Sequence, residues 1–153
     1  MKIVFGVIFL VLGSFIGKKA TDKYLQSKKY FAAFANFNRN LISNLEYKRE
    51  SVKTLATRNY GFTDFEKTVK SAFCENEEIF IPKYLDEIQV KTVKDYLDEV
   101  GRNNENAERA FLTYYDGEIV KILDECTDKN KKYGSLGLKL GFAAGAAAFI
   151  LII

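Results

Sequence analysis

The residues of this 153-residue chain with the clearest capacity for chemistry are carboxylates that stand next to each other. Adjacent pairs of this kind include Glu77-Glu78, Asp86-Glu87 and Asp98-Glu99. Paired acids can bind divalent cations or act as general acid and base. Because adjacent side chains on a helix point in different directions, we interpret these pairs as solvated helix faces.

The other residue types that chemistry requires are scarce. Histidine, the commonest general base and metal ligand, is absent. The two cysteines, Cys74 and Cys126, do not form a CxxC pair and have no histidine to complete a zinc site. The sequence contains neither a GxxxxGK[ST] phosphate loop nor a GxSxG nucleophile motif. We therefore expect no enzyme activity, no cofactor and no metal site.

Charge is distributed unevenly along the chain. Residues 18–70 carry 12 Lys and Arg against 5 Asp and Glu, whereas residues 71–128 carry 6 against 15. A nucleic-acid-binding protein more often concentrates one sign of charge, so we expect no nucleic-acid partner. Two interpretations stay open: a basic helix packs against acidic helices in one domain, or an acidic face is offered to a basic partner.

Two apolar segments enclose this charged middle. Residues 3–17 and 140–153 have no ionisable side chain, and lysines flank both segments on the side of the middle. We expect an N-terminal membrane anchor at 1–17, a helical domain at 18–133 and a C-terminal membrane helix at 134–153. The 15 residues of the first segment span about 22 Å as a helix, less than the ~30 Å hydrocarbon core. A cleaved signal peptide is the alternative, although no small-x-small cleavage site follows.

Glycines in both segments recur at a spacing of four residues. They are Gly137, Gly141 and Gly145 in the second segment and Gly13 and Gly17 in the first. Small residues at this spacing let helix backbones approach closely in lipid, so these glycines are candidate packing positions. The segments could pair with each other as a hairpin or with neighbouring copies in a homo-oligomer. The flanking lysines place the middle domain in the cytoplasm by the positive-inside rule.

The middle domain is expected to be helical throughout, giving an all-α bundle of long antiparallel helices. Apolar residues at helical spacing predict a helix from Thr21 to Thr57, whose stripe Asn38 interrupts. Thr63 and Glu66 form an expected capping box for the next helix. A third helix is expected from about Thr92 to Gly101.

The last helix of the middle domain is expected to begin at an asparagine cap, Asn103 or Asn104. No strong breaker occurs before Gly134, so this helix could continue into the second apolar segment. Its buried stripe is predicted to comprise Ala107, Phe111, Tyr114, Ile122 and Cys126.

Three short motifs carry a family resemblance. They are residues 132–137 (KYGSLG) before the apolar tail, residues 96–102 (YLDEVGR) and, more weakly, residues 44–47 (NLEY). In order and layout the chain resembles stage III sporulation protein AB, a membrane protein of endospore-forming bacteria. The family's turn, a helix stop followed by a polar cap, corresponds to Gly101, Arg102 and Asn104. Departures include Asn104 for the family's Asp, Glu108 for its Gln, and residues 48–52 for its Gly-x-Thr-Pro-Leu.

The resemblance implies a non-enzymatic platform similar to the type II secretion F domain. It implies a place in the mother-cell membrane facing the forespore, with the middle domain cytoplasmic. Expected partners are other stage III sporulation membrane proteins, a secretion-type ATPase and membrane lipid. The alternative is a generic membrane-tethered helical adaptor or scaffold unrelated to sporulation. A small pore former ranks last, because the apolar segments offer almost no polar lining.

Overall fold

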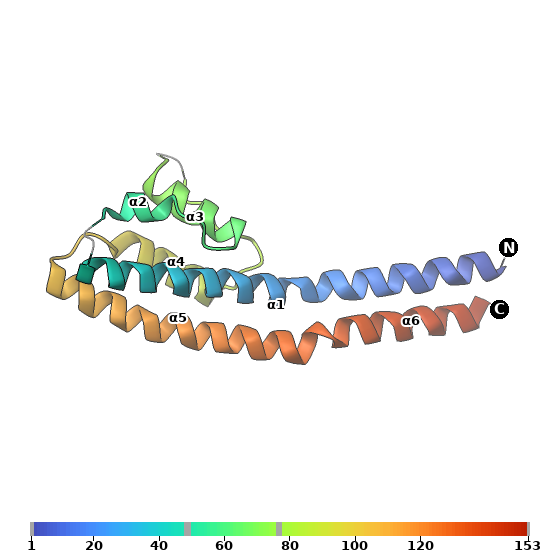
Figure 1. Cartoon of the computed structure of the whole chain (residues 1–153). Helices are drawn as coiled ribbons and strands as arrows, with labels where there is room; N and C mark the ends of the chain where they lie inside the picture. The colour runs from blue at the N-terminus through green and yellow to red at the C-terminus, as the bar shows by residue number, and fades with distance from the viewer. Residues whose placement is uncertain (1, 48–49, 76–77, 153) are drawn as a thin grey trace. The chain divides into compact units, whose positions relative to one another are not determined.

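The computed structural model describes residues 2–47, 50–75 and 78–152. The helices in these ranges are α1 (Lys2–Tyr47), α2 (Val52–Ala56), α3 (Thr63–Phe73), α4 (Glu87–Glu99), α5 (Glu105–Gly134) and α6 (Leu136–Ile152) (Figure 1). No strand occurs in the described ranges, which confirms the all-α fold class.

Contacts divide the chain into two compact units. The terminal unit comprises Met1–Lys28 and Glu125–Ile153, and the central unit comprises Lys29–Asp124. Both α1 and α5 contribute a segment to each unit. Helix α1 continues past residue 17 without a break. The division at 1–17, 18–133 and 134–153 that the sequence suggests stays a prediction.

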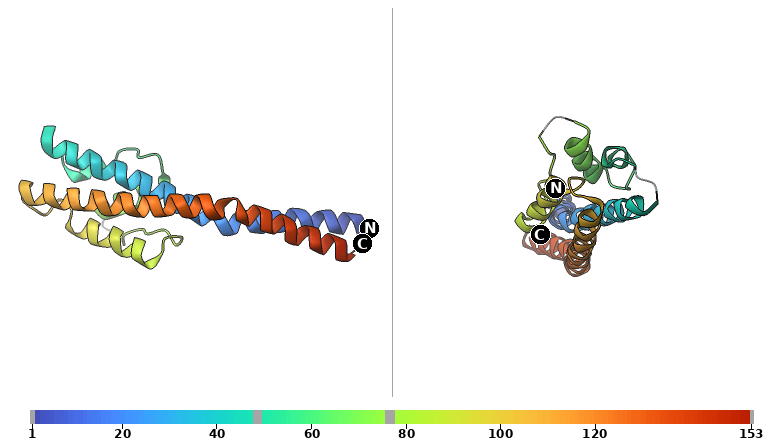
Figure 2. Two further views of the ribbon diagram at one scale, coloured as in Figure 1. Left: turned by 90° about the horizontal axis from the view of Figure 1, so that it is seen from below. Right: turned by 90° about the vertical axis from the view of Figure 1, so that its left-hand side faces the viewer.

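Helix α1 is the centre of the central unit. Its segment after Lys29 buries a wide apolar face, while Asn36, Arg39 and Asn40 lie on an exposed polar face. The buried residues are Tyr30, Phe31, Ala33, Phe34, Ala35, Phe37, Asn38 and Leu41. Helices α3, α4 and α5 pack around this segment (Figure 2). The expected stripe is therefore present, but Asn38 belongs to it rather than interrupting it.

Aromatic rings from several elements fill the core of the central unit. The ring of Phe34 lies 4.7 Å from that of Tyr96 in α4, edge to face, and 5.5 Å from that of Phe65 in α3. Phe37 contacts the ring of Tyr60, in the loop before α3, at 5.3 Å. Edge-to-face and offset-stacked ring pairs stabilise a core beyond the area they bury, so these contacts fix α3 and α4 against α1.

The first helix ends earlier than the sequence predicts. It stops at Tyr47 rather than Thr57, and the short helix α2 follows separately. The amide of Asn44 binds the backbone of Glu50 in both directions, at 2.7 and 3.0 Å. The Ser51 hydroxyl then accepts a bond from the Thr54 N–H at 3.2 Å and caps α2. These side-chain bonds replace the helical bonds of a continuous helix.

The predicted capping box at Thr63 is wrong. Helix α3 begins at Thr63 itself, with Phe62 in the cap position and no side-chain cap bond. The Glu66 carboxylate still reaches back, accepting bonds from the N–H groups of Tyr60 at 2.9 Å and Gly61 at 3.2 Å. It therefore secures the loop rather than the first turn of the helix.

A complete capping box opens α4 instead. The carboxylate of Asp86 accepts a bond from the Gln89 N–H at 3.0 Å, and the Gln89 side chain accepts one from the Asp86 N–H at 3.2 Å. Helix α4 therefore begins at Glu87, five residues before the predicted Thr92. It ends before Gly101, whose φ of 81° is a left-handed conformation that favours glycine.

The predicted buried stripe of α5 is wrong in its first half. Tyr114 is 64% exposed and Ala107 is also exposed, whereas Glu108, Leu112 and Ile119 are buried. Ile122 and Cys126 are buried, as predicted. The first half of the helix therefore buries Glu108 and Leu112, each one residue after a predicted position, Ala107 or Phe111.

In the terminal unit, the first part of α1 and helix α6 run antiparallel (Figures 1 and 2). Ser135 separates α5 from α6, and the Lys139 N–H donates to its carbonyl at 3.2 Å. Among the described residues, no helix combines the length and the apolar character that a membrane span requires. The prediction of flanking transmembrane helices is therefore not supported.

Candidate functional site

Three of the predicted packing glycines meet inside the terminal unit. A Cβ placed on Gly17 would lie 2.0 Å from the carbonyl oxygen of Gly137 and 3.2 Å from the Cα of Gly141. A Cβ on Gly137 would lie 2.4 Å from the Gly17 carbonyl oxygen. No side chain fits at either position, so the backbones of α1 and α6 are in direct contact there. Gly145 is buried on α6, and Gly13 lies one turn before Gly17 on α1.

Aromatic and basic residues flank this glycine contact. The rings of Tyr24 and Tyr133 stack with centroids 5.4 Å apart. The Lys23 and Lys132 ammonium groups lie 5.1 and 5.3 Å from the centroids of the Tyr24 and Tyr133 rings, respectively. Tyrosine and lysine together are typical of the interface between lipid and water.

The terminal unit also exposes large apolar side chains. Phe15 is 66% exposed on α1, and Leu140 is 65% exposed on α6. The others include Val11, Leu12, Leu136, Phe142 and Ile150. Exposed apolar side chains in such number on two paired helices are typical of a site of membrane or protein contact.

The turn between α4 and α5 has a structural role. The side-chain oxygen of Asn104 accepts a bond from the Ala107 N–H at 3.0 Å, so Asn104 is the expected asparagine cap. The N–H of Arg102 donates to the Glu99 carbonyl at 3.2 Å, while its side chain is exposed. Together with Gly101, these residues end one helix and start the next.

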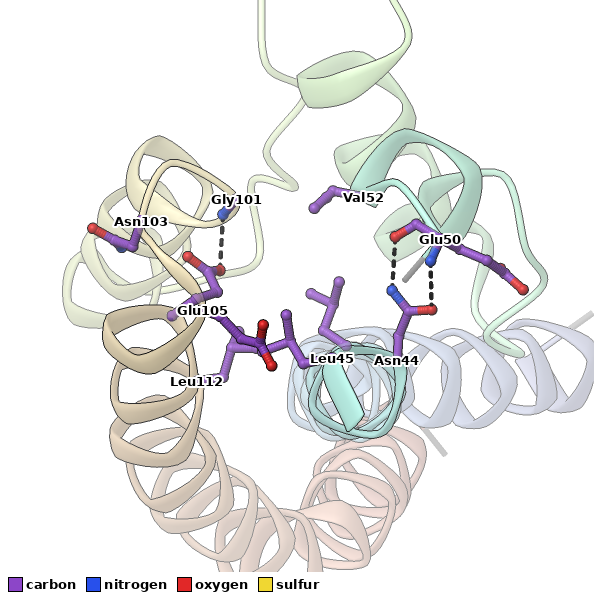
Figure 3. A pocket seen from close by; sticks show the side chains of 10 residues that line it. Asn44, Leu45, Glu50, Val52, Gly101, Asn103, Glu105 and Leu112 are labelled. Carbon is purple, nitrogen blue, oxygen red and sulfur yellow. Dashed lines mark hydrogen bonds between the residues drawn. The ribbon is translucent and has the colours of Figure 1, made fainter. Parts of the chain in front are cut away.

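A pocket of about 320 Å³ lies beside this turn (Figure 3). Its walls come from α1, from the segment around α2, from the turn and from the start of α5. They comprise Leu41, Asn44, Leu45, Glu50, Val52, Gly101, Asn103, Glu105, Glu108 and Leu112. The Glu108 side chain is 5% exposed and accepts a bond from the Gly101 N–H at 2.8 Å. Its other oxygen, Oε2, is buried with no hydrogen-bond partner among the described residues.

A second buried polar group lies deeper in the core. The fully buried amide of Asn38 donates to the Leu112 carbonyl at 3.0 Å and accepts from the Tyr96 hydroxyl at 3.0 Å. It also lies 3.4 Å from a carboxylate oxygen of Asp116. One side chain thereby links α1, α4 and α5. Neither Asn38 nor Glu108 was expected to be buried, because each is polar within an apolar stripe.

An acidic and aromatic surface covers the junction of α4 and α5. We call it the Tyr114 surface; it comprises Asp95, Glu99, Tyr114, Tyr115 and Glu118. The exposed ring of Tyr114 lies 5.3 Å from that of Tyr115. Partial burial, followed by the carboxylates of Asp95 and Glu99, raises the pKa of the Tyr115 hydroxyl. The carboxylates therefore lie close enough to the rings to make one negative patch.

The carboxylate pairs do not assemble into a metal site within the described ranges, where no group of three potential ligands converges. Asp86 caps α4, and Glu87 is exposed beside it. Asp98 and Glu99 are exposed on α4, and Glu78 is exposed. Glu77 lies outside the described residues. Cys74 is half-buried and Cys126 is buried, and the two thiols are not joined in a disulfide.

Ion pairs join the basic and acidic parts of the central unit. Arg39 of α1 lies 3.5 Å from the carboxylate of Asp116 on α5, and Arg109 lies 3.1 Å from that of Glu46. All four side chains are at least partly exposed, so each pair contributes little stability. These pairs account for part of the charge asymmetry and leave the Tyr114 surface negative.

Comparison with known proteins yields no match to a protein-family model, a curated protein or a solved structure. The functional argument therefore rests on the residues of this chain.

Proposed function

We propose that this chain is a non-enzymatic platform subunit. The paired apolar helices of the terminal unit hold it at a membrane, and the central unit docks other proteins. The observation that carries the proposal is the glycine contact between α1 and α6, surrounded by exposed apolar side chains such as Phe15 and Leu140. In lipid, small residues let helices pack closely while large apolar residues face the acyl chains.

The Tyr114 surface is the candidate docking face. Exposed tyrosine is enriched at protein interfaces, because its ring buries area at low entropic cost. The surrounding carboxylates favour a partner with basic residues and speed its association. In this proposal the partner contacts α4 and α5 from the cytoplasm.

The specific assembly that we propose is the stage III sporulation complex between mother cell and forespore. The proposal rests on the resemblance of residues 132–137 and 96–102 to the stage III sporulation AB family. Partners would be other membrane proteins of that complex, with a secretion-type ATPase beside them. The chain would reside in the mother-cell membrane facing the forespore.

Deleting the gene in a spore-forming host should block spore maturation after engulfment. The measurement is the yield of heat-resistant spores, with restoration by the wild-type gene as the positive control. A normal yield from the deletion strain would overturn the sporulation assignment.

Affinity capture from detergent-solubilised membranes of sporulating cells tests the docking face separately. The paired substitution Glu99→Lys with Tyr114→Ala should reduce recovery of the partners. Tyr47→Ala, which removes an 80% exposed tyrosine from α1, is the matched control and should leave recovery unchanged. Equal recovery with both variants would exclude the Tyr114 surface.

The alternative is a membrane-tethered adaptor unrelated to sporulation, which the same apolar and acidic surfaces would serve. Gene neighbourhood separates the two: a secretion-type ATPase gene immediately upstream favours the platform. Partners that are captured equally from vegetative cells would favour the adaptor.

A further inference from the structure

The pocket beside the α4–α5 turn contains a buried acceptor without a donor. The Oε1 atom of Glu108 is satisfied by the Gly101 N–H at 2.8 Å, but Oε2 has no partner among the described residues. A carboxylate oxygen accepts hydrogen bonds and cannot donate them when ionised. Leaving it buried and unpaired is costly, so the missing group is a hydrogen-bond donor.

The carboxylates that line the pocket favour a cationic donor. Three carboxylates line the walls, from Glu50, Glu105 and Glu108, and no basic residue among the described ones does so. Glu50 pairs with Arg58 and Glu105 has an interaction of its own, whereas the second carboxylate oxygen of the buried Glu108 lacks a partner among the described residues. Lys48 and Arg49 lie outside the described residues. A cationic donor would pair with the second carboxylate oxygen of Glu108.

The remaining walls suit an apolar stem. Leu41, Leu45, Val52 and Leu112 supply aliphatic surface around the carboxylate. The Asn44 amide is already bonded to the Glu50 backbone on both of its polar atoms, so it shapes the wall (Figure 3). The volume of about 320 Å³ is at the lower end for ligand pockets, which limits the ligand to a small group.

We infer that this pocket binds an ammonium or guanidinium group carried on a short alkyl stem, with Glu108 as its counter-ion. A free small amine or guanidine and an Arg or Lys side chain of a protein partner share this chemistry. The inference does not depend on the membrane role or on sporulation, so it stands or fails separately from the proposed function.

Binding is measured on the full chain in detergent micelles at low salt, by calorimetry and by the NMR shift of the Gly101 amide. That amide reports directly on Glu108 through their hydrogen bond. The free probes are butylguanidinium and butylammonium, with neutral butylurea as the comparison. Both cations should bind and shift the Gly101 resonance, and butylurea should not.

Glu108→Gln should weaken cation binding about 10-fold or more, because the second oxygen becomes an amide donor while an acceptor remains for Gly101. Glu118→Gln removes the same charge from the same helix outside the pocket and should bind like wild type. Should Glu108→Gln fail to fold by circular dichroism, Leu45→Phe narrows the pocket from the half-buried side chain of Leu45 and should also abolish binding.

The source of the cation is decided with short peptides that carry one Arg, one Lys or the neutral analogue citrulline. Tighter binding of the Arg or Lys peptide than of the free probes assigns the site to a partner side chain. Tighter binding of the free probes assigns it to a small cation. No cation binding, or binding that Glu108→Gln leaves unchanged, overturns the inference.

Discussion

At the scale of single residues, the buried amide of Asn38 is the most consequential side chain. Its bonds to Leu112 and Tyr96 satisfy polar groups on two other helices. Removing one partner leaves the others buried and unpaired, and that penalty exceeds the net value of the bond itself. Asn38 and Tyr96 therefore form an energetically coupled pair.

Tyr96→Phe should lower the free energy of unfolding by about 1–2 kcal/mol, because it leaves the Asn38 oxygen unpaired. Asn38→Ala should cost about 2–4 kcal/mol, because it also creates a cavity. Urea unfolding of the full chain in mild detergent, followed by circular dichroism, measures both values. The control Asn106→Ala, on the exposed face of α5, should change stability little. Wild-type stability in both core variants would contradict the coupling.

The buried tyrosines predict a loss of stability in alkali. Burial raises the pKa of Tyr30, Tyr84 and Tyr96 above the usual range, and for Tyr84 the neighbouring carboxylate of Asp64 adds to the effect. Unfolded tyrosine ionises near pH 10, so its contribution is complete below about pH 10 and is lost as the pH rises further. The free energy of unfolding should therefore fall above about pH 10 and stay free of this effect between pH 7 and 9.

Tyr96→Phe tests this dependence, because it removes one of the ionising groups. Its unfolding free energy should fall less steeply with pH than that of the wild-type chain, in urea titrations between pH 9 and 12. Identical slopes would show that ionisation of Tyr96 does not contribute to the loss of stability in alkali.

At the scale of the elements, the turn at Gly101 is the connection most sensitive to substitution. An alanine at this position would have to keep the φ of 81°, and its Cβ would lie 3.0 Å from a methyl group of Val52. Gly101→Ala should destabilise the chain by about 1–2 kcal/mol, since left-handed backbone is costly for any other L-residue. Gly117→Ala, inside α5 with open space around it, should stabilise by about 0.5–1 kcal/mol. Thermal unfolding of both variants checks the opposite signs.

The pairing of α1 with α6 makes a second prediction at this scale. Gly137→Leu should force these helices apart, because its Cβ would collide with the Gly17 carbonyl and Thr21. Electron–electron double resonance between spin labels that replace Phe15 and Leu140, in a chain whose native cysteines have been replaced, measures the distance between α1 and α6. Association of the chain with its membrane partners should weaken, whereas the helical circular dichroism signal that the central unit contributes should persist.

Gly117→Leu is the matched control, because Gly117 has no neighbour within 4 Å. An unchanged distance between the labels in Gly137→Leu would exclude a backbone contact at this glycine.

Local chemistry predicts the ends of several elements well, and long-range packing explains the errors. Gly101 and Asn104 act as stop and cap, as their residue types indicate. The pattern of a capping box fits both Thr63 with Glu66 and Asp86 with Gln89, but only the second forms. The first fails because Glu66 binds the N–H groups of Tyr60 and Gly61 instead.

The site residues were harder to predict than the fold. The inward-facing positions of α5 alternate at spacings of four and three: the buried Glu108 and Leu112, the half-buried Tyr115, and the buried Ile119 and Ile122. This is the spacing of a coiled-coil seam, but a glutamate at its start hides the pattern from a search for apolar residues. An apolar search chose Phe111 and Tyr114, one position away. A test for strict heptad spacing that tolerates polar residues would have found Glu108 and Asn38.

At the scale of the whole molecule, the exposed apolar surface of the terminal unit should govern partition into lipid. Val11→Ser, Phe15→Ser and Leu140→Ser combined should reduce binding to vesicles by about 100-fold or more, at roughly 1.5–3 kcal/mol per large side chain withdrawn from lipid. Flotation of the full chain with phospholipid vesicles measures this partition.

The matched control carries Tyr47→Ser, Ile88→Ser and Tyr114→Ser, which remove exposed side chains from the central unit. It should float like wild type. Equal loss in both triple variants would indicate unspecific adsorption rather than insertion of the terminal unit.

The Asn38 contact also determines the alignment of two helices. Helix α1 and the first part of α5 present repeating apolar positions to each other, and such a seam tolerates sliding by one heptad. In a slipped pairing, Asn38 would lose the Leu112 carbonyl and the Tyr96 hydroxyl while remaining buried among apolar side chains. One polar residue thereby selects a single register for the antiparallel pair and disfavours the shifted alternatives, a specificity that the aromatic core alone would not provide.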